Sequence, residues 1–151
     1  MKKILLLVVT MANVILLQAQ ENDGFKFSFN HLALSVKDVN RSAAFYTEIF
    51  KLKEITNRTA MDGIRWISLG EGKELHLIAI LKEAVKVNKA VHFALSTAHF
   101  DSFIKVLNEK KIVFSDWPGN VNTINKRADG ILQIYLQDPD GYWIEVNSVV
   151  N

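Results

Sequence analysis

The sequence predicts an α+β fold made of two modules, each with the order strand, helix, strand, strand, strand (βαβββ). Two observations support this prediction. The segment His31-Leu-Ala-Leu-Ser35 recurs, with a single difference, as His92-Phe-Ala-Leu-Ser96. After each copy the hydrophobic pattern predicts one helix and then three short strands, so the repeated segment opens two similar units.

The first module, 26–81, begins with an expected strand over 27–36. A helix over 41–50 follows, which Asp38 or Asn40 can cap. The apolar residues of this helix recur at helical spacing, so one side of it is expected to face the core. Three extended runs separated by turn residues complete the module, at 52–58, 64–69 and 73–80.

The second module, 89–150, repeats this order. A strand over 90–96 leads into a helix over about 97–110, for which Thr97 is the expected N-cap. The turn Asp138-Pro-Asp-Gly141 suits a tight connection between two strands. The remaining expected strands are 112–115, 131–137 and 142–148.

Residues 1–20 have the pattern of a secretory signal peptide. Lys2 and Lys3 precede an apolar run over 4–17, and the small residue Ala19 lies at its exit. The run is shorter than the roughly 20 apolar residues of a spanning helix, so we expect cleavage, a periplasmic or extracellular location and no membrane association afterwards. Without the two leader lysines the 18 basic residues become 16, equal to the 16 acidic ones, which argues against a nucleic-acid partner.

Three histidines and one glutamate occupy matching positions in the two modules. Strand side chains alternate between two faces, so His31 and His92 lie opposite their apolar neighbours in the first strand of each module. His76 and Glu145 hold the same kind of position in the last strands. A single strand histidine is usually a hydrogen-bonded core residue, but three imidazoles and a carboxylate together predict one divalent metal site for Zn, Ni, Co, Mn or Fe.

Three segments resemble the vicinal oxygen chelate superfamily, which includes glyoxalase I, bleomycin and fosfomycin resistance proteins, methylmalonyl-CoA epimerase and extradiol dioxygenases. They are Asn30–Val36, Arg41–Phe50 and Asp138–Val146, and the resemblance covers about 28–148. It implies a glyoxalase-like fold in which the paired modules form an open eight-stranded cup. The implied metal ligands, on the first and fourth strands, are His31, His76, His92 and Glu145.

The chain departs from the superfamily pattern at two positions. His76 stands where the glyoxalase and epimerase branches usually carry glutamate or glutamine, and Lys51 replaces a glycine often found after the first helix. Cups of this superfamily form within one chain or across two, so a homodimer stays open. The resemblance therefore predicts the fold better than it predicts the substrate.

Four ligands on a six-coordinate metal leave two neighbouring positions, which suits a small substrate with adjacent oxygens. We expect a lyase or isomerase that removes a proton beside a carbonyl, with Glu145 as the catalytic base and the metal stabilising the enediolate. An exported bacterial protein meets little glutathione, which disfavours a strictly glutathione-dependent glyoxalase.

Two other functions remain open at this stage. The first is a metal-free antibiotic-binding protein of the bleomycin-resistance type. The second is an Fe(II) extradiol dioxygenase, because His31, His92 and Glu145 alone form a two-histidine, one-carboxylate set. That enzyme needs three open metal positions, and ligation by His76 would remove one of them.

The substrate wall of the cup is expected to come from the last two strands. Gln133, Tyr135 and Trp143 are the candidate wall residues. Arg65 and Arg127 are candidate contacts for an anion, although Arg65 alternates with Trp66, so only one of the two can face the cup. The polar segment 117–129 is a candidate lid.

Overall fold

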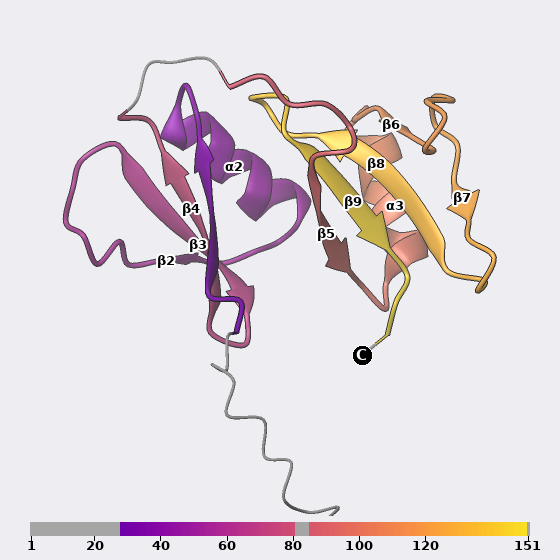
Figure 1. The fold of residues 1–151 in the computed structure, drawn as a ribbon, viewed down its shortest axis with the longest axis horizontal. Coiled ribbons are helices and arrows are strands. Elements are labelled where there is room, and N and C mark those ends of the chain that lie inside the picture. Colours follow the sequence, from indigo (N-terminus) through magenta and orange to yellow (C-terminus); the bar gives the residue numbers. More distant parts are fainter. Residues whose placement is uncertain (1–27, 81–84, 151) are drawn as a thin grey trace, which may run out of the picture.

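The structure is a computed structural model that describes residues 28–80 and 85–150. Two modules lie side by side in it, one built on α2 and the other on α3 (Figure 1). The α+β fold of two βαβββ modules is thereby confirmed. The expected signal peptide, 1–20, lies outside the described residues. Within the described ranges, no helix combines the length and the apolar character needed to cross a membrane.

The first module forms a four-stranded sheet with the strand order β1-β4-β3-β2. β1 pairs with β4 in parallel, and the other neighbours pair antiparallel. The helix joins β1 to β2, as expected from the sequence. The elements of the first module are β1 (His31–Ser35), α2 (Val39–Ile49), β2 (Glu54–Ile55), β3 (Ile64–Gly70) and β4 (Lys73–Ile78).

The second module forms a five-stranded sheet with the order β5-β9-β8-β6, and β7 also pairs with β8. β5 and β9 are parallel, like β1 and β4. β7 lies in the segment expected to be a polar loop. The elements are β5 (His92–Ser96), α3 (Phe100–Glu109), β6 (Phe114–Ser115), β7 (Asn125–Lys126), β8 (Leu132–Gln137) and β9 (Trp143–Asn147).

The two parallel strand pairs share the same register. Ala33 lies opposite His76 in the first module, and Ala94 lies opposite Glu145 in the second. His31 and His92 each precede the matched alanine by two residues, and therefore project from the same face of the strand. The internal repeat of the sequence is thus also a repeat of strand order and register.

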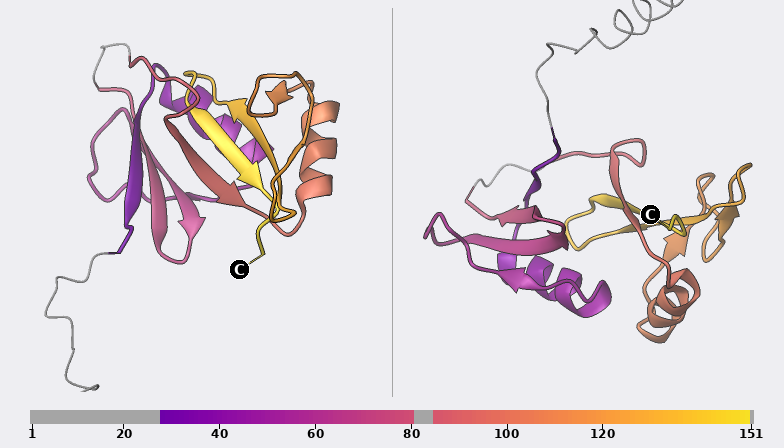
Figure 2. Two further views of the ribbon diagram at one scale, coloured as in Figure 1. Left: turned by 45° about the vertical axis from the view of Figure 1, so that its right-hand side comes forward. Right: turned by 90° about the horizontal axis from the view of Figure 1, so that it is seen from below.

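Each helix covers one face of its own sheet (Figure 2). Leu34, Leu75 and Leu77 pack with residues of α2, and Ile144 and Val146 belong to the same apolar core. Because side chains alternate, the histidines lie on the opposite faces. We call these the histidine faces: the uncovered face of each sheet, which carries His31 and His76 in the first module and His92 and Glu145 in the second.

The beginnings of the helices only partly follow the sequence prediction. The Asp38 carboxylate accepts hydrogen bonds from the backbone of Asn40 and Arg41, which confirms it as the cap of α2. Thr97 does not cap α3, because that helix begins later, with His99 at the N-cap. The Thr97 hydroxyl instead accepts the backbone N–H of His99 at 3.0 Å. This hydrogen bond closes a local turn ahead of the helix.

Each helix is followed closely by a lysine with a left-handed backbone. Lys51 follows α2 and Lys111 follows α3, and both adopt a left-handed backbone with φ of 55°. At α3 the N–H of Ile112 donates to Leu107 O at 2.8 Å and that of Lys111 donates to Asn108 O at 3.1 Å. These two hydrogen bonds form a Schellman motif at the end of α3. The left-handed position of this motif, here Lys111, is usually occupied by glycine.

Two expected strands are much shorter than predicted. The run 52–58 contributes only Glu54–Ile55, and 112–115 contributes only Phe114–Ser115. Both lie at the ends of the main strand order, and β6 is also bridged on its outer side by the isolated pair Ser115 and Val121.

The turn between β8 and β9 joins the modules. Asp138 Oδ2 accepts the hydroxyl of Tyr46 on α2 at 2.9 Å. The Asp140 carboxylate accepts the backbone N–H of Lys37 at 2.9 Å and the hydroxyl of Ser42 at 2.8 Å. The hydroxyl of Tyr142 donates to Ser35 O at 2.9 Å, so four hydrogen bonds fix the second module against β1 and α2.

One surface ion pair makes stability depend on pH. Hydrogen bonds from Arg65 lower the pKa of the Glu54 carboxyl below its usual 4.5. A carboxylate with a lowered folded pKa stabilises the fold above its unfolded pKa, and this contribution disappears as the pH falls through the folded value. In urea unfolding, the stability advantage of wild type over Glu54→Gln should therefore shrink below pH 4.5.

Glu109→Gln, at the exposed end of α3, is the matched control for this pH dependence. It removes a surface carboxylate outside the ion pair of Glu54 and Arg65, and so gives the baseline for the Glu54→Gln difference. If the stability difference between wild type and Glu54→Gln did not change with pH, the ion pair would not contribute to the pH dependence of stability.

Candidate metal centre and substrate wall

His92 and Glu145 form a donor pair on the second module. His92 Nδ1 lies 2.8 Å from the carbonyl oxygen of Lys89, and a carbonyl only accepts, so Nδ1 carries the proton and Nε2 keeps a free lone pair. That Nε2 lies 3.5 Å from Glu145 Oε2. Two donors at about 2.1 Å from one cation lie roughly 3–3.5 Å apart, so this pair fits two ligands of a divalent metal.

The buried Glu145 carboxylate is held on both oxygens. Oε2 accepts the Tyr135 hydroxyl at 2.7 Å, and Oε1 accepts Nδ2 of Asn147 at 2.9 Å. The Tyr135 hydroxyl in turn accepts Nε2 of Gln133 at 2.9 Å. Burial, and then the hydrogen bond to Glu145, raise the pKa of Tyr135 above its usual 10.0, so this hydroxyl stays a donor at neutral pH. Gln133 and Tyr135 therefore lie beside Glu145 and orient it.

Aromatic rings surround His92, with one lysine among them. The ring centroid of Tyr135 lies 5.4 Å from that of His92, and that of Trp117 lies 6.2 Å away. Lys89 Nζ lies 4.8 Å from the centre of the Trp143 ring. The sequence pattern did not single out Lys89 or Trp117; the one available signal was a tryptophan inside an otherwise polar loop.

His31 and His76 form a second donor pair, on the first module. Their rings are stacked, with centroids 4.3 Å apart and planes inclined by 14°. His31 Nδ1 lies 2.7 Å from Asn30 Oδ1, which leaves Nε2 free to bind a metal. His76 Nε2 lies 2.8 Å from Glu74 Oε2, so only Nδ1 of His76 remains available.

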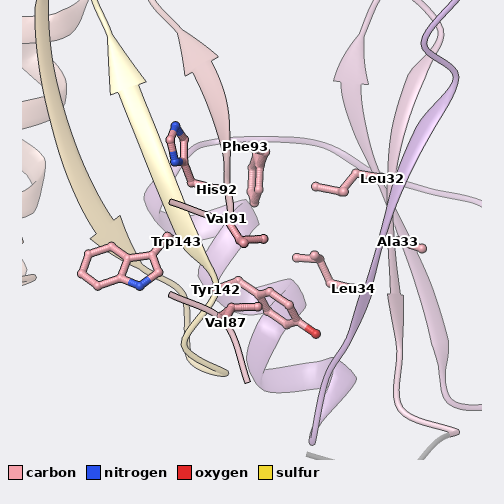
Figure 3. A pocket seen from close by; sticks show the side chains of 9 residues that line it. All are labelled: Leu32, Ala33, Leu34, Val87, Val91, His92, Phe93, Tyr142 and Trp143. Carbon is pink, nitrogen blue, oxygen red and sulfur yellow. The ribbon is translucent and has the colours of Figure 1, made fainter. Parts of the chain in front are cut away.

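The two donor pairs point in different directions. A mainly apolar cleft of about 250 Å³ lies between β1 and β5. Figure 3 shows Leu32 and Leu34 pointing into this cleft, whereas Ala33 points to the far side of β1 and His92 to the far side of β5. His31 shares the face of Ala33, so the histidine faces look away from each other across the cleft.

The predicted ligands are therefore two pairs in one chain. Within 28–80 and 85–150, no three His, Cys, Asp or Glu side chains gather as a group that could hold a metal ion. Each pair nevertheless offers nitrogen or carboxylate donors with free lone pairs, which is suitable chemistry for a divalent cation. The donor chemistry of each pair thus fits a divalent metal, although one chain does not bring the two pairs together within the described residues.

Arg65 does not join the histidine face. It forms an ion pair with Glu54, and its NH1 donates to Asn40 Oδ1 at 3.0 Å, on the side of α2. Trp66 takes the histidine face instead and stacks on His76, with centroids 4.0 Å apart. The alternation of these two residues predicted that only one would face the site, and it is the tryptophan.

Arg127 lies nearer to the second donor pair. Its NH2 donates to Asp129 at 2.6 Å, and its charge acts to lower the pKa of Tyr135. The candidate lid, 117–129, is partly fixed, because β7 pairs with β8 inside it. Arg127 thus remains a candidate for contacting an anion at the edge of the wall.

The fold is thus a pair of βαβββ modules that carry histidine or glutamate side chains on their first and last strands. The family model of the Glyoxalase/Bleomycin resistance protein/Dioxygenase superfamily matches residues 28–146. The chain belongs to this superfamily. The resemblance seen in the three sequence segments is thereby confirmed.

The individual relatives share less than a third of their aligned residues with this chain. The chain is 27% identical over 129 residues to metallothiol transferase FosB of Staphylococcus saprophyticus, which covers 80% of this chain and 76% of the relative. Among solved structures, oxidase ChaP-H2 matches with a TM-score of 0.70 at 20% identity, over 83% of this chain and 96% of that one. Lactoylglutathione lyase of Agrobacterium tumefaciens matches with a TM-score of 0.61 at 19% identity, over 83% and 96%.

The superfamily narrows the class of function. Its members are mostly enzymes that act on small molecules, typically with a divalent metal, and they often form dimers. The two structural neighbours show the fold alone at their level of identity.

Proposed function

We propose that this protein is a metal-dependent enzyme whose active site is completed by two copies of the chain. His31 of one copy would meet His92 and Glu145 of the other. The observation that supports this arrangement is that each module presents donors with free lone pairs, while the two histidine faces of one chain look away from each other. In a two-fold dimer the first module of each copy can face the second module of the other, which gives two equal sites.

The proposed site suits a small substrate with neighbouring oxygens. A divalent cation held by these three side chains supplies Lewis-acid polarisation of a substrate oxygen. Trp117, Tyr135 and Trp143 would supply an aromatic wall beside the reacting atoms.

The reaction we favour is that of a lyase or isomerase. Glu145 takes a proton beside a substrate carbonyl, and Tyr135 and Asn147 keep the carboxylate in place. The signal peptide proposed for residues 1–20 would place the protein outside the cytoplasm, where thiol cofactors are scarce. A reaction that needs no thiol fits that location.

A thiol transferase is the second candidate. It is favoured by the FosB relative and by the hydrogen bonds on both Glu145 oxygens, which suit a fixed ligand better than a mobile base. The two reactions differ in what they consume. Deuterium uptake from heavy water into a hydroxycarbonyl substrate supports the lyase or isomerase, whereas loss of free thiol supports the transferase.

Subunit mixing tests the shared site. We expect His31→Ala and His92→Ala each to lose tight zinc binding. When the two variants are unfolded together and refolded in equal amounts, about a quarter of the wild-type zinc content should return, because half of randomly paired dimers carry one intact site out of two. The measurements are zinc content by elemental analysis and mass by light scattering.

Two results would contradict the arrangement. One is tight metal binding by wild-type protein that remains a monomer. The other is a mixture that forms dimers and regains no zinc. A mixture of His31→Ala with Glu145→Gln serves as a repeat of the test with a different second-module donor.

A further inference from the structure

Four side chains form a continuous stack on the histidine face of the first module. The Arg58 guanidinium lies 4.4 Å from the centre of the Trp66 ring. Trp66 stacks on His76 with centroids 4.0 Å apart and planes inclined by 6°, and His76 stacks on His31. His31 is thus the outermost layer, and His76 is the layer directly beneath it.

Glu74 ties the stack together at its edge. Its carboxylate accepts NH2 of Arg58 at 2.7 Å and contacts His76 Nε2 at 2.8 Å. Arg58 and His76 are the layers on either side of Trp66, so the carboxylate bridges across the indole ring. The Nε1–H of Trp66 is buried and has no hydrogen-bond partner among the described residues, so the contacts of this ring that the structure shows are the stacking contacts with His76 and Arg58.

The stack is incompatible with ligation of one ion by both His31 and His76. A metal lies close to the plane of each imidazole that binds it, about 2.0–2.1 Å from the nitrogen. The two rings are almost parallel, at a centroid distance of 4.3 Å. Stacked rings cannot approach closer than roughly 3.5 Å, so an ion in the plane of His31 lies too far from the plane of His76.

We propose that His76 is a positioning residue, the layer that sets the ring orientation of His31, and is not the fourth metal ligand. The proposal rests on the metal-dependent function proposed above. Arg58, Trp66 and Glu74 fix His76, and His76 in turn holds the exposed His31 ring so that its Nε2 meets the incoming cation. The sequence expectation of four ligands becomes a set of three, with His76 beneath them.

Two substitutions of His76 separate positioning from ligation. His76→Phe keeps a flat ring in the stack and removes both nitrogens. His76→Ala removes the layer. A positioning role predicts zinc affinity within about threefold of wild type for the phenylalanine variant, and a loss of about 10–100-fold for the alanine variant, the usual range for groups that orient a ligand. Competition with a chelator measures both affinities, and circular dichroism checks folding.

The possible outcomes are distinct. If His76→Phe loses zinc as completely as His31→Ala, then His76 is a ligand and the proposal is overturned. If His76→Ala binds zinc as wild type does, the stack has no positioning role, which also overturns it. If wild-type protein binds no divalent cation, the proposed function itself fails, a result visible before any variant is made.

Nuclear magnetic resonance gives an independent test on the unaltered protein. In cadmium-loaded, nitrogen-labelled wild type, the ring nitrogens of His31 and His92 should show coupling to cadmium. His76 should show none. Coupling at His76 would overturn the proposal even if the phenylalanine variant failed to fold.

Discussion

Replacing Glu145 with glutamine is expected to lower the affinity for the divalent cation by more than about 100-fold, because groups that merely orient a ligand already contribute 10–100-fold. The substitution removes the only negative charge of the proposed ligand set. It also places an amide between two donors, the Tyr135 hydroxyl and the Asn147 amide, so one of these donors now faces an N–H₂ group in place of an acceptor oxygen. Titration of metal-free protein with zinc against a competing chelator measures the change.

Tyr135→Phe is the matched comparison for Glu145→Gln. It removes one hydrogen bond to the carboxylate and leaves the ring beside His92. The loss of affinity should lie at about 10–100-fold, below that of the glutamine variant. If Glu145→Gln binds zinc within about threefold of wild type, Glu145 is not a ligand and the proposed centre is wrong.

Replacing Asp138 with alanine is expected to lower the free energy of unfolding by about 3–5 kcal/mol, because it leaves one buried and two part-buried donors without an acceptor. These donors are the Tyr46 hydroxyl and the backbone N–H groups of Asp140 and Tyr142, each at 2.9 Å. Burial raises the pKa of Asp138, and the N–H of Tyr142 and the Tyr46 hydroxyl act against this rise. Urea unfolding of both proteins measures the difference.

A double-mutant cycle with Tyr46→Phe isolates the contact between the modules. Tyr46→Phe alone removes one hydroxyl, at an expected cost of about 1 kcal/mol. If the two residues are coupled, Asp138→Ala should cost less in the phenylalanine background than in wild type. A cost below 1 kcal/mol for Asp138→Ala alone would show that this turn does not hold the modules together.

Local patterns predicted most of each module. Alternation along the strands was sufficient to place His31 and His92 opposite the core, because one face of each strand is consistently apolar. Asp38 could be identified as a cap because an aspartate just before a helix can accept the backbone N–H groups two and three residues further on, here those of Asn40 and Arg41. The prediction of Thr97 as the N-cap was wrong because a threonine hydroxyl can either close a turn or cap a helix. The sequence does not show which of the two will occur.

Long-range contacts could not be predicted in the same way. The orientation of the second module relative to the first depends on the hydrogen bonds that Asp138 and Asp140 accept from α2. These two residues lie far from α2 in sequence. The choice between Arg65 and Trp66 for the histidine face depends on where Glu54 lies. These pairings explain why four candidate ligands were identified while their division into two pairs was not.

A three-ligand centre would reopen the dioxygenase alternative. With His76 acting only as a layer beneath His31, a six-coordinate ion would retain three open positions, enough for a catechol and oxygen. Oxygen uptake with catechols by iron-loaded protein would support that reaction, whereas none would favour the lyase or isomerase.

Lys51 and Lys111, the two lysines with a left-handed backbone, place positive charges near the carbonyl ends of α2 and α3. Each left-handed non-glycine residue costs roughly 1–2 kcal/mol. A positive charge beside the carbonyl end of a helix recovers about 0.3–1 kcal/mol, and dissolved salt weakens this attraction. Both helix ends are therefore expected to be slightly more stable at low ionic strength than in concentrated salt.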